Sequence, residues 1–153
     1  MNAIALNAGV GVGGEFTKTD LQAELNLIEL NVASTVHLAK RVVKDMVSRG
    51  AGKILFTSSI ISQMPSPFQA VYAASKAFVH SFSEVIRNEL KDTGVTVTAL
   101  MPGPTETNFF HRAGLDDTKI GADKNQGAIS SILPDTVTAE INRKLNEPGS
   151  ANK

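Results

Sequence analysis

The sequence of 153 residues contains no cysteine, which excludes disulfides, thiol catalysis and zinc sites built on cysteine. Charge of one sign is not in excess either, because 15 lysines and arginines balance 15 aspartates and glutamates. A chain with balanced charge lacks the basic surface patch that favours binding to nucleic acid or to an anionic membrane. We therefore expect neither as a partner.

Long apolar runs are also missing. None approaches the roughly 20 residues that span a bilayer, and no signal peptide precedes the first predicted strand. Together with the lack of cysteine, this predicts a cytoplasmic protein. The three histidines, His37, His80 and His111, lie too far apart in the sequence to suggest a metal site. We interpret each as a surface or packing residue and expect no metal.

Strand-like and helix-like segments alternate regularly along the chain, and 42% of its residues are hydrophobic, which fits a single domain over residues 1–153. Three short apolar runs, residues 3–6, 53–58 and 95–100, are separated by two long helical patterns. This order predicts parallel crossovers and an open α/β sheet of about three strands.

The first helical pattern follows a T-x-x-Q capping signature at residues 19–22, and Gly50 and Gly52 end it. Its apolar positions recur at three- and four-residue steps, as expected for the buried face of one helix. They are Leu21, Leu25, Ile28, Val32, Val36, Ala39, Val43 and Met46.

The second helical pattern follows another capping signature, Ser66-Pro67-Phe68-Gln69, with proline at the first helical position. We expect this helix to run to about Asp92, before Gly94. Its expected inward positions are Ala74, Phe78, Phe82, Val85 or Ile86, and Leu90. Farther on, residues 105–133 contain no convincing strand, and residues 134–147 are expected to form a short helix.

Small and polar residues follow all three predicted strands, at the sheet edge where ligands bind in folds of this kind. Among them, Tyr72 is the only tyrosine, and Lys76 stands one helical turn away on the same face. A lysine ammonium at that distance favours the phenolate and would lower the phenol pKa from about 10 toward the working range. Ser59 could bind a substrate oxygen beside the phenol. Each feature also has a simpler interpretation, because a tyrosine with a neighbouring lysine is common on amphipathic helices and a serine often caps one.

The motifs together resemble the short-chain dehydrogenase/reductase family, classical type. Residues 55–60 (LFTSSI) and 70–76 (AVYAASK) are similar to its serine strand and Y-x-x-x-K helix, with Ser59 thirteen residues before Tyr72. Residues 7–9 (NAG), Asn31 within LNV, and residues 102–107 (PGPTET) match three further motifs in the same order. The likeness covers about residues 3–110, and it assigns residues 111–153 to a more weakly matched lid and terminal helix.

This resemblance implies an oxidoreductase that interconverts an alcohol and a carbonyl by hydride transfer, with NAD or NADP as cofactor. Tyr72 would exchange a proton with the substrate, and Ser59 would orient the substrate oxygen. Lys76 would lower the tyrosine pKa and hold the nicotinamide ribose. Asn31 would hold a water that relays protons to Lys76.

The same resemblance implies the remaining cofactor contacts. Asn7, Ala8 and Gly9 would support the adenosine side. Pro102 and Gly103 would contact the nicotinamide half, and Thr105 and Thr107 would lie near the carboxamide and phosphates.

The sequence departs from the family at the phosphate-binding loop, T-G-x-x-x-G-x-G, which these residues do not contain. We therefore expect a truncated chain, a partial Rossmann-like domain that lacks the first βαβαβ half and a second piece near residues 125–127. Both long helices would then lie on one face of the sheet, leaving an apolar face bare and favouring a homo-oligomer. The alternative is a non-catalytic, truncated or engineered fragment that acts only through self-association. A hydrolase using Ser59 lacks the G-x-S-x-G elbow and a paired histidine.

Residues 9–14 also spell G-x-G-x-x-G, the dinucleotide fingerprint. A true fingerprint opens a helix at once, whereas residues 15–18 separate this glycine loop from the next cap. We interpret the match as accidental, and the N-A-G letters as the informative part.

Overall fold

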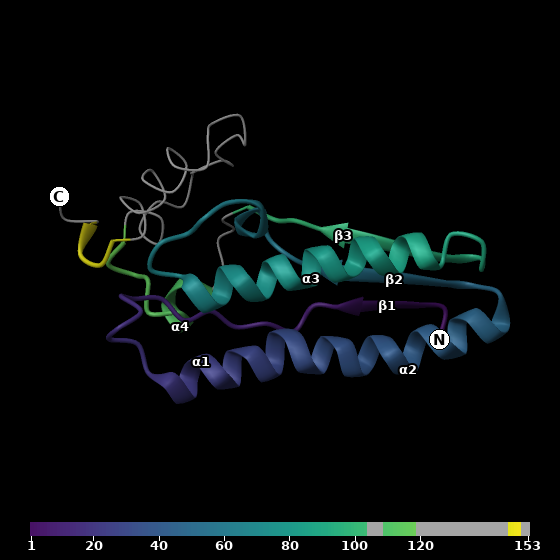
Figure 1. Ribbon diagram of the computed structural model, residues 1–153, viewed down its shortest axis with the longest axis horizontal. Coiled ribbons are helices and arrows are strands. Elements are labelled where there is room, and N and C mark those ends of the chain that lie inside the picture. Colours follow the sequence, from purple (N-terminus) through teal and green to yellow (C-terminus); the bar gives the residue numbers. More distant parts are fainter. Residues whose placement is uncertain (104–108, 119–146, 151–153) are drawn as a thin grey trace.

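The computed structural model describes residues 1–103, 109–118 and 147–150. These residues form a three-stranded parallel sheet with the long helices packed on one face (Figure 1). In chain order the elements are β1 (Ala3–Leu6), α1 (Leu21–Ile28), the π-helix η1 (Glu29–Ala33), α2 (Ser34–Arg49), β2 (Gly52–Thr57), the 3-10 helix η2 (Ile60–Gln63), α3 (Ala70–Glu89), β3 (Val95–Leu100) and α4 (Phe109–Arg112). The α/β class and the three strands are confirmed, whereas the short helix α4 was not expected.

The sheet has the strand order β1-β2-β3, and its register brings the carboxyl ends of all three strands to one edge. Leu6 pairs with Phe56, and Thr57 pairs with Leu100. The loops that follow the strands therefore leave the sheet side by side. This edge is where the predicted site residues gather.

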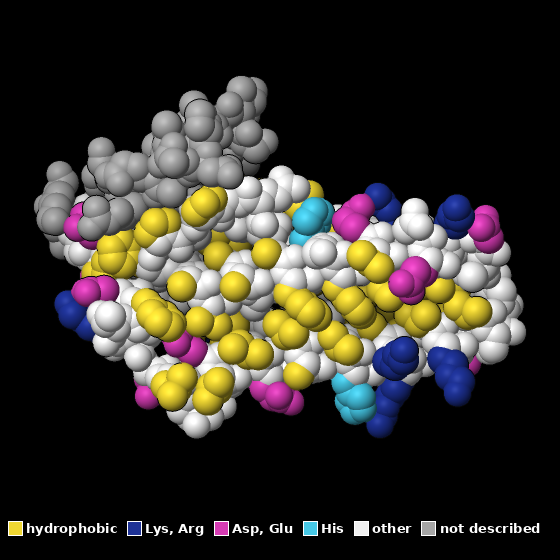
Figure 2. All heavy atoms as spheres, viewed as in Figure 1, with side chains coloured by type: hydrophobic (Ala, Val, Ile, Leu, Met, Phe, Trp, Pro, Cys, Tyr) yellow, Lys and Arg dark blue, Asp and Glu magenta, His cyan; other side chains and the backbone are white. Residues whose placement is uncertain are grey.

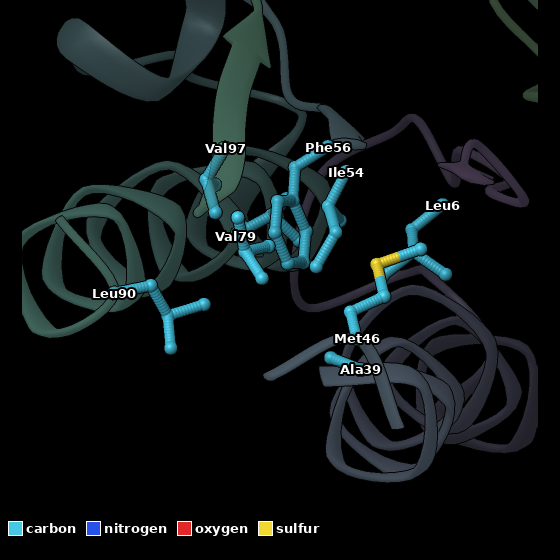
Figure 3. Packing of buried hydrophobic residues seen from close by; sticks show 9 residues of the cluster. Leu6, Ala39, Met46, Ile54, Phe56, Val79, Leu90 and Val97 are labelled. Carbon is cyan, nitrogen blue, oxygen red and sulfur yellow. The ribbon is translucent and has the colours of Figure 1, made fainter. Parts of the chain in front are cut away.

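The hydrophobic core fills the space between the sheet and the two long helices (Figure 3). Ile54 and Phe56 of β2 and Val97 of β3 point toward α2 and α3, where Met46 and Val79 meet them. Each such side chain contributes about 1.5–3 kcal/mol when it is fully buried. The placement of both long helices on one face is thus confirmed.

The opposite face of the sheet is less apolar than the sequence analysis expected. Because side chains alternate along a strand, the residues between the core positions point to this face. Lys53, Thr96 and Thr98 are exposed there, and Leu100 is the large apolar side chain among the exposed ones. Polar and small groups thus occupy much of the surface that was predicted to be hydrophobic.

The first helix is buried on a different face from the one predicted, because a π-turn interrupts it. A π-turn contains one more residue than an α-turn, so it shifts the helical register by one position. The prediction is correct after the π-turn, at Ala39 and Met46, and wrong by one residue before it. There Leu27 is fully buried while Ile28 is 41% exposed.

Both predicted caps are also wrong in detail. The N-cap of α1 is Asp20, whose carboxylate accepts from the Ala23 N–H at 2.8 Å. The hydroxyl of Thr19 instead donates to the Glu24 carboxylate. Residues 66–69 form a turn rather than a first helical turn, with the Gln69 N–H donating to the Ser66 carbonyl. Within it Phe68 has φ of +66°, so α3 begins only at Ala70.

The predicted inward face of α3 is partly wrong. Phe82, Ile86 and Leu90 do pack against the core, but Ala74 and Phe78 are exposed. Polar side chains occupy part of the buried face of α3 instead. Several of them are hydrogen-bonded there, which offsets the cost of burying a polar group. The buried residues within α3 are Tyr72, Ser75, Lys76, Val79 and Ser83.

The helix expected over residues 134–147 and the break expected near residues 125–127 lie outside the described residues. Within the part of the chain that the structure describes, no helix is both long and apolar enough to cross a membrane.

Candidate active site

The loops that follow β2 and β3 are joined at the carboxyl edge of the sheet. The Ser58 N–H donates to the Leu100 carbonyl at 2.8 Å, and the Ile60 N–H donates to the Pro102 carbonyl at 3.2 Å. Ser59 lies between these two bonds and caps η2 in an extended conformation, so its hydroxyl is held at the edge by backbone on both sides. This places the serine next to the first turns of α3.

Tyr72 lies on the buried face of α3 and shares a hydrogen bond with the Ser59 side chain. Burial raises the pKa of Tyr72 to about 12, and the bond to Ser59 lowers it only in part. The predicted lowering toward neutrality is therefore not found in this structure. The physical reason is desolvation, because the charged phenolate loses more hydration than its neighbours replace.

Lys76 is buried one turn after Tyr72. Its Nζ donates to the Thr57 carbonyl at 3.0 Å and lies 5.8 Å from the centroid of the Tyr72 ring. Burial also lowers the pKa of Lys76, because the ammonium loses hydration inside the protein. Tyr72 and Lys76 thus form a close pair in which burial disfavours charge on both members.

Asn31 lies in the π-helix and is 1% exposed. Its Oδ1 accepts from the Val10 N–H at 2.9 Å, and its Nδ2 donates to the Val10 carbonyl at 2.9 Å. A second Nδ2 bond reaches the hydroxyl of Ser75 at 3.0 Å. The side chain therefore joins the loop after β1 to α3, so the geometry shows a bridging role. The predicted water relay stays a prediction.

Sequence reasoning missed two buried serines that hold α3 at the site. Ser58 donates to the Lys76 carbonyl at 2.8 Å, and Ser75 donates to the Tyr72 carbonyl at 2.7 Å. Both lie next to predicted site residues, within the motifs of residues 55–60 and 70–76. The available signal was their position beside Ser59 and Lys76 on segments that must pack against each other.

The loop over residues 9–14 uses its N–H groups within the protein. Gly13 donates to the Ala113 carbonyl and Gly14 donates to the Phe68 carbonyl, both at 2.8 Å. Gly13 also packs so closely that an added Cβ would lie 2.2 Å from Leu115. A phosphate cradle requires free N–H groups and an adjoining helix start. The loop instead packs against neighbouring segments, which supports the view that its fingerprint match is accidental.

The surroundings of Gly9 explain why the N-A-G motif ends in glycine. An added Cβ there would lie 3.3 Å from both Asn31 Oδ1 and Lys76 Nζ, so a side chain would crowd the two polar groups. Thr57, whose carbonyl accepts from Lys76 Nζ, has a buried Oγ1 without a hydrogen-bond partner among the described residues. Glycine at this position therefore leaves the Asn31 amide and the Lys76 ammonium uncrowded.

The other predicted cofactor residues are placed in part. Asn7 and Ala8 are exposed directly after β1, and Pro102 and Gly103 follow β3 at the same edge. A Cβ added at Gly103 would meet Ile60 at ordinary contact distance. Thr105 and Thr107 lie outside the described residues.

The histidines are separate in the structure as well as in the sequence. His111 pairs with Asp116 at 2.8 Å on the surface, and Nδ1 of His80 is buried with no hydrogen-bond partner in the described part of the chain. In the ranges that the structure describes, no group of three acidic or histidine side chains could hold a metal ion.

Comparison with known proteins gives relatives over most of this chain. The family model described as short chain dehydrogenase matches residues 1–118. Dehydrogenase/reductase SDR family member 7B of Rattus norvegicus is 36% identical over 121 residues, which is 78% of this chain and 37% of that protein.

Solved structures agree with this result. A short-chain dehydrogenase from Sphingobium yanoikuyae in complex with NADPH has a TM-score of 0.72 at 32% identity, over 74% of this chain and 44% of that one. A gluconate 5-dehydrogenase from Burkholderia cenocepacia in complex with NADP and tartrate also has a TM-score of 0.72, at 25% identity, over 80% of this chain and 48% of that one. The chain spans less than half the length of each of these three proteins. On its sheet, its ordered motifs and these matches, the chain belongs to the short-chain dehydrogenase family of oxidoreductases.

Proposed function

We propose that this chain carries the proton-transfer site of an NAD(P)-dependent oxidoreductase that interconverts a small alcohol and a carbonyl. The observation that supports it most is the meeting of Ser59, Tyr72 and Lys76 at the carboxyl edge of the sheet. The phenol is buried against the serine hydroxyl, and the ammonium lies one turn away. A phenol beside a hydroxyl group is an arrangement that suits general acid–base catalysis.

The roles follow from the chemistry of each group. Tyr72 gives its proton to the carbonyl oxygen during reduction and takes one from the hydroxyl during oxidation. Ser59 holds the substrate oxygen beside the phenol, and Lys76 stabilises the phenolate once the proton has left. Burial raises the pKa of Tyr72 to about 12, so the phenol of the free chain holds its proton at neutral pH.

A nicotinamide cofactor supplies or accepts the hydride when it is bound. The residues proposed to hold it are those that the family motifs indicate: Asn7, Ala8, Gly9, Tyr72, Lys76, Pro102, Gly103, Thr105 and Thr107. The position of Gly9 supports this assignment, since an added Cβ there would lie 3.3 Å from Lys76 Nζ. Asn31 is proposed to support Lys76 from the other side.

A second candidate is a chain that acts only through self-association. Exposed apolar side chains favour it, because Leu21 and Val85 on the long helices are 67% and 53% exposed. Self-association and catalysis are compatible, so we also propose a homo-oligomer. Only the catalytic proposal requires Tyr72.

The test is turnover with and without the phenol oxygen. Wild type and Tyr72→Phe are mixed with NADPH or NADH and a set of small ketones, and the loss of reduced cofactor is followed. We expect kcat to fall by about 100-fold or more in the variant, because general acid catalysis contributes about that factor. Equal rates in the two proteins would refute the role of Tyr72. Wild type without turnover on either cofactor would refute the catalytic proposal itself.

A further inference from the structure

Ser75 is a buried serine whose hydroxyl joins two parts of the site. Its Oγ accepts from Asn31 Nδ2 at 3.0 Å and donates to the Tyr72 carbonyl at 2.7 Å. The residue is 3% exposed, so water does not readily replace either bond. Ser75 thereby connects the π-helix to the backbone of the residue that carries the phenol.

The amide of Asn31 depends on this hydroxyl. One Nδ2 hydrogen is donated to the Val10 carbonyl and the other to Ser75, while Oδ1 accepts from the Val10 N–H. Without the Ser75 hydroxyl, one amide hydrogen would be left without a partner in a buried position. The Asn31 amide would then be free to rotate, and its two hydrogen bonds to Val10 would weaken.

Val10 follows Gly9, which lies against Lys76. A Cβ at Gly9 would be 3.3 Å from both Asn31 Oδ1 and Lys76 Nζ, so the glycine backbone, the amide and the ammonium pack closely together. A shift of the Asn31 amide therefore changes the surroundings of Nζ. Ser75 contacts Asn31, Asn31 contacts the loop of Gly9 and Val10, and Gly9 lies against Lys76. Because Lys76 is on α3 with Ser75 and Tyr72, this series of contacts begins and ends on the same helix.

Ser83 provides a comparison within the same helix. It is 1% exposed, and its hydroxyl donates to the His80 carbonyl at 2.7 Å, three residues earlier. Ser75 makes the same local bond to Tyr72. The difference is the additional donor from Asn31, which joins Ser75 to another element.

We propose that Ser75 is a positioning residue, which fixes the Asn31 amide and through it the loop of Gly9 and Val10 against Lys76, and so sets the alignment of the Tyr72–Lys76 pair. This inference rests on the proposed function, since the alignment matters for proton transfer. Ser75 does not itself touch the reacting atoms in this account.

The first test compares Ser75→Ala with Ser83→Ala in the full 153-residue chain. Each substitution removes one buried hydroxyl and one bond to a carbonyl of α3. We expect Ser75→Ala to lower kcat roughly ten-fold or more with little change in KM, because small misplacements of a catalytic group are costly. Ser83→Ala should leave kcat unchanged. Ser75→Cys, a milder change with a weaker acceptor, should give an intermediate kcat and serves if the alanine variant does not fold.

The same substitution is then made in an Asn31→Ala background. If Ser75 acts through Asn31, its removal there should have little further effect on kcat, because the interaction is already lost. Independent effects that multiply in the double variant would contradict the proposal.

A readout without turnover separates this inference from the proposed function. Hydrogen exchange of the Val10 amide reports directly on its bond to Asn31. We expect faster exchange in Ser75→Ala than in wild type or Ser83→Ala. Equal exchange in the two variants would overturn the positioning role, whether or not the protein turns over. If wild type is inactive but Val10 exchange rises only in Ser75→Ala, the proposed function fails and the positioning contact stands.

Discussion

At the scale of single residues, the main departure from expectation is the pKa of Tyr72, which burial raises although a lysine lies nearby. A lysine four residues away suggested a lowered phenol pKa. In the folded chain Lys76 is itself buried and its Nζ is bonded to the Thr57 carbonyl, and desolvation of the phenol outweighs the hydrogen bond with Ser59. The spacing of the two residues could be read from the sequence, but the degree of desolvation depends on residues distant in the chain.

The raised pKa of Tyr72 predicts a specific loss of stability in alkali. The phenol titrates near 10.0 when unfolded and near 12 when folded, so the unfolded state releases its proton first. The neutral folded phenol therefore stabilises the protein fully below pH 10, and this contribution disappears as the pH rises to 12. It amounts to about 2–3 kcal/mol.

Chemical unfolding of wild type and Tyr72→Phe at several pH values measures this contribution. The free energy of unfolding of wild type should fall relative to that of the variant across this interval. Lys76 has the opposite sign, because its lowered pKa penalises the folded state most at lower pH, but it is present in both proteins and cancels. The chain has one tyrosine and no tryptophan, so the phenolate absorbance follows Tyr72 alone. A phenol that titrates near 10 in the folded protein would contradict the account.

The proximity of Ser59, Tyr72 and Lys76 could be predicted, because Ser59 stands directly after a strand and Lys76 stands one helical turn from Tyr72. Ser58 and Ser75 were not predicted, since a serine within a helix or after a strand has no distinctive pattern. Their roles depend on contacts between elements, at Lys76 and Asn31, that a linear spacing does not report.

At the scale of elements, strands were easier to predict than helix faces. The alternation of Val95, Thr96, Val97 and Thr98 shows directly which side of β3 faces the core. The π-turn at residues 29–33 left no comparable signal, so the apolar stripe was assigned one residue too far along α1. The buried face of α3 was also predicted only in part, because several of its buried side chains are polar and do not contribute to an apolar pattern.

The cap of α1 gives a direct prediction at this scale. Replacing Asp20 with alanine removes the acceptor for the Ala23 N–H and should cost about 1 kcal/mol of stability. Asp20→Asn keeps a side-chain acceptor and should cost only a few tenths of that figure. Urea unfolding of the two variants measures both. Equal losses would show that the charge of Asp20, rather than its cap, stabilises the helix.

At the scale of the whole molecule, apolar side chains remain exposed along both long helices. Figure 2 shows hydrophobic side chains spread over this face of the molecule. Leu25 and Ile28 on α1 are 47% and 41% exposed, and Phe78 and Val85 on α3 are 40% and 53% exposed. Exposed apolar surface of this extent favours association.

We therefore expect the purified chain to sediment as an oligomer rather than as a 16.2 kDa monomer. The double substitution Phe78→Asp and Val85→Asp should shift it toward the monomer, since charges in an apolar contact are costly. Thr98→Asp, on the opposite face of the sheet, provides the control and should leave association unchanged. A wild-type chain that is monomeric at every concentration tested would contradict this expectation.

We propose that the edge formed by Gly9, Ser59, Tyr72 and Lys76 holds a nicotinamide cofactor. The most direct measurement is a fluorescence titration of NADPH and of NADH with the wild-type chain and with Gly9→Val. We predict saturable binding to wild type at up to millimolar cofactor, and a marked loss in Gly9→Val, whose side chain would enter the space against Asn31 and Lys76. No binding to wild type at millimolar cofactor, or equal binding to both proteins, would contradict the account.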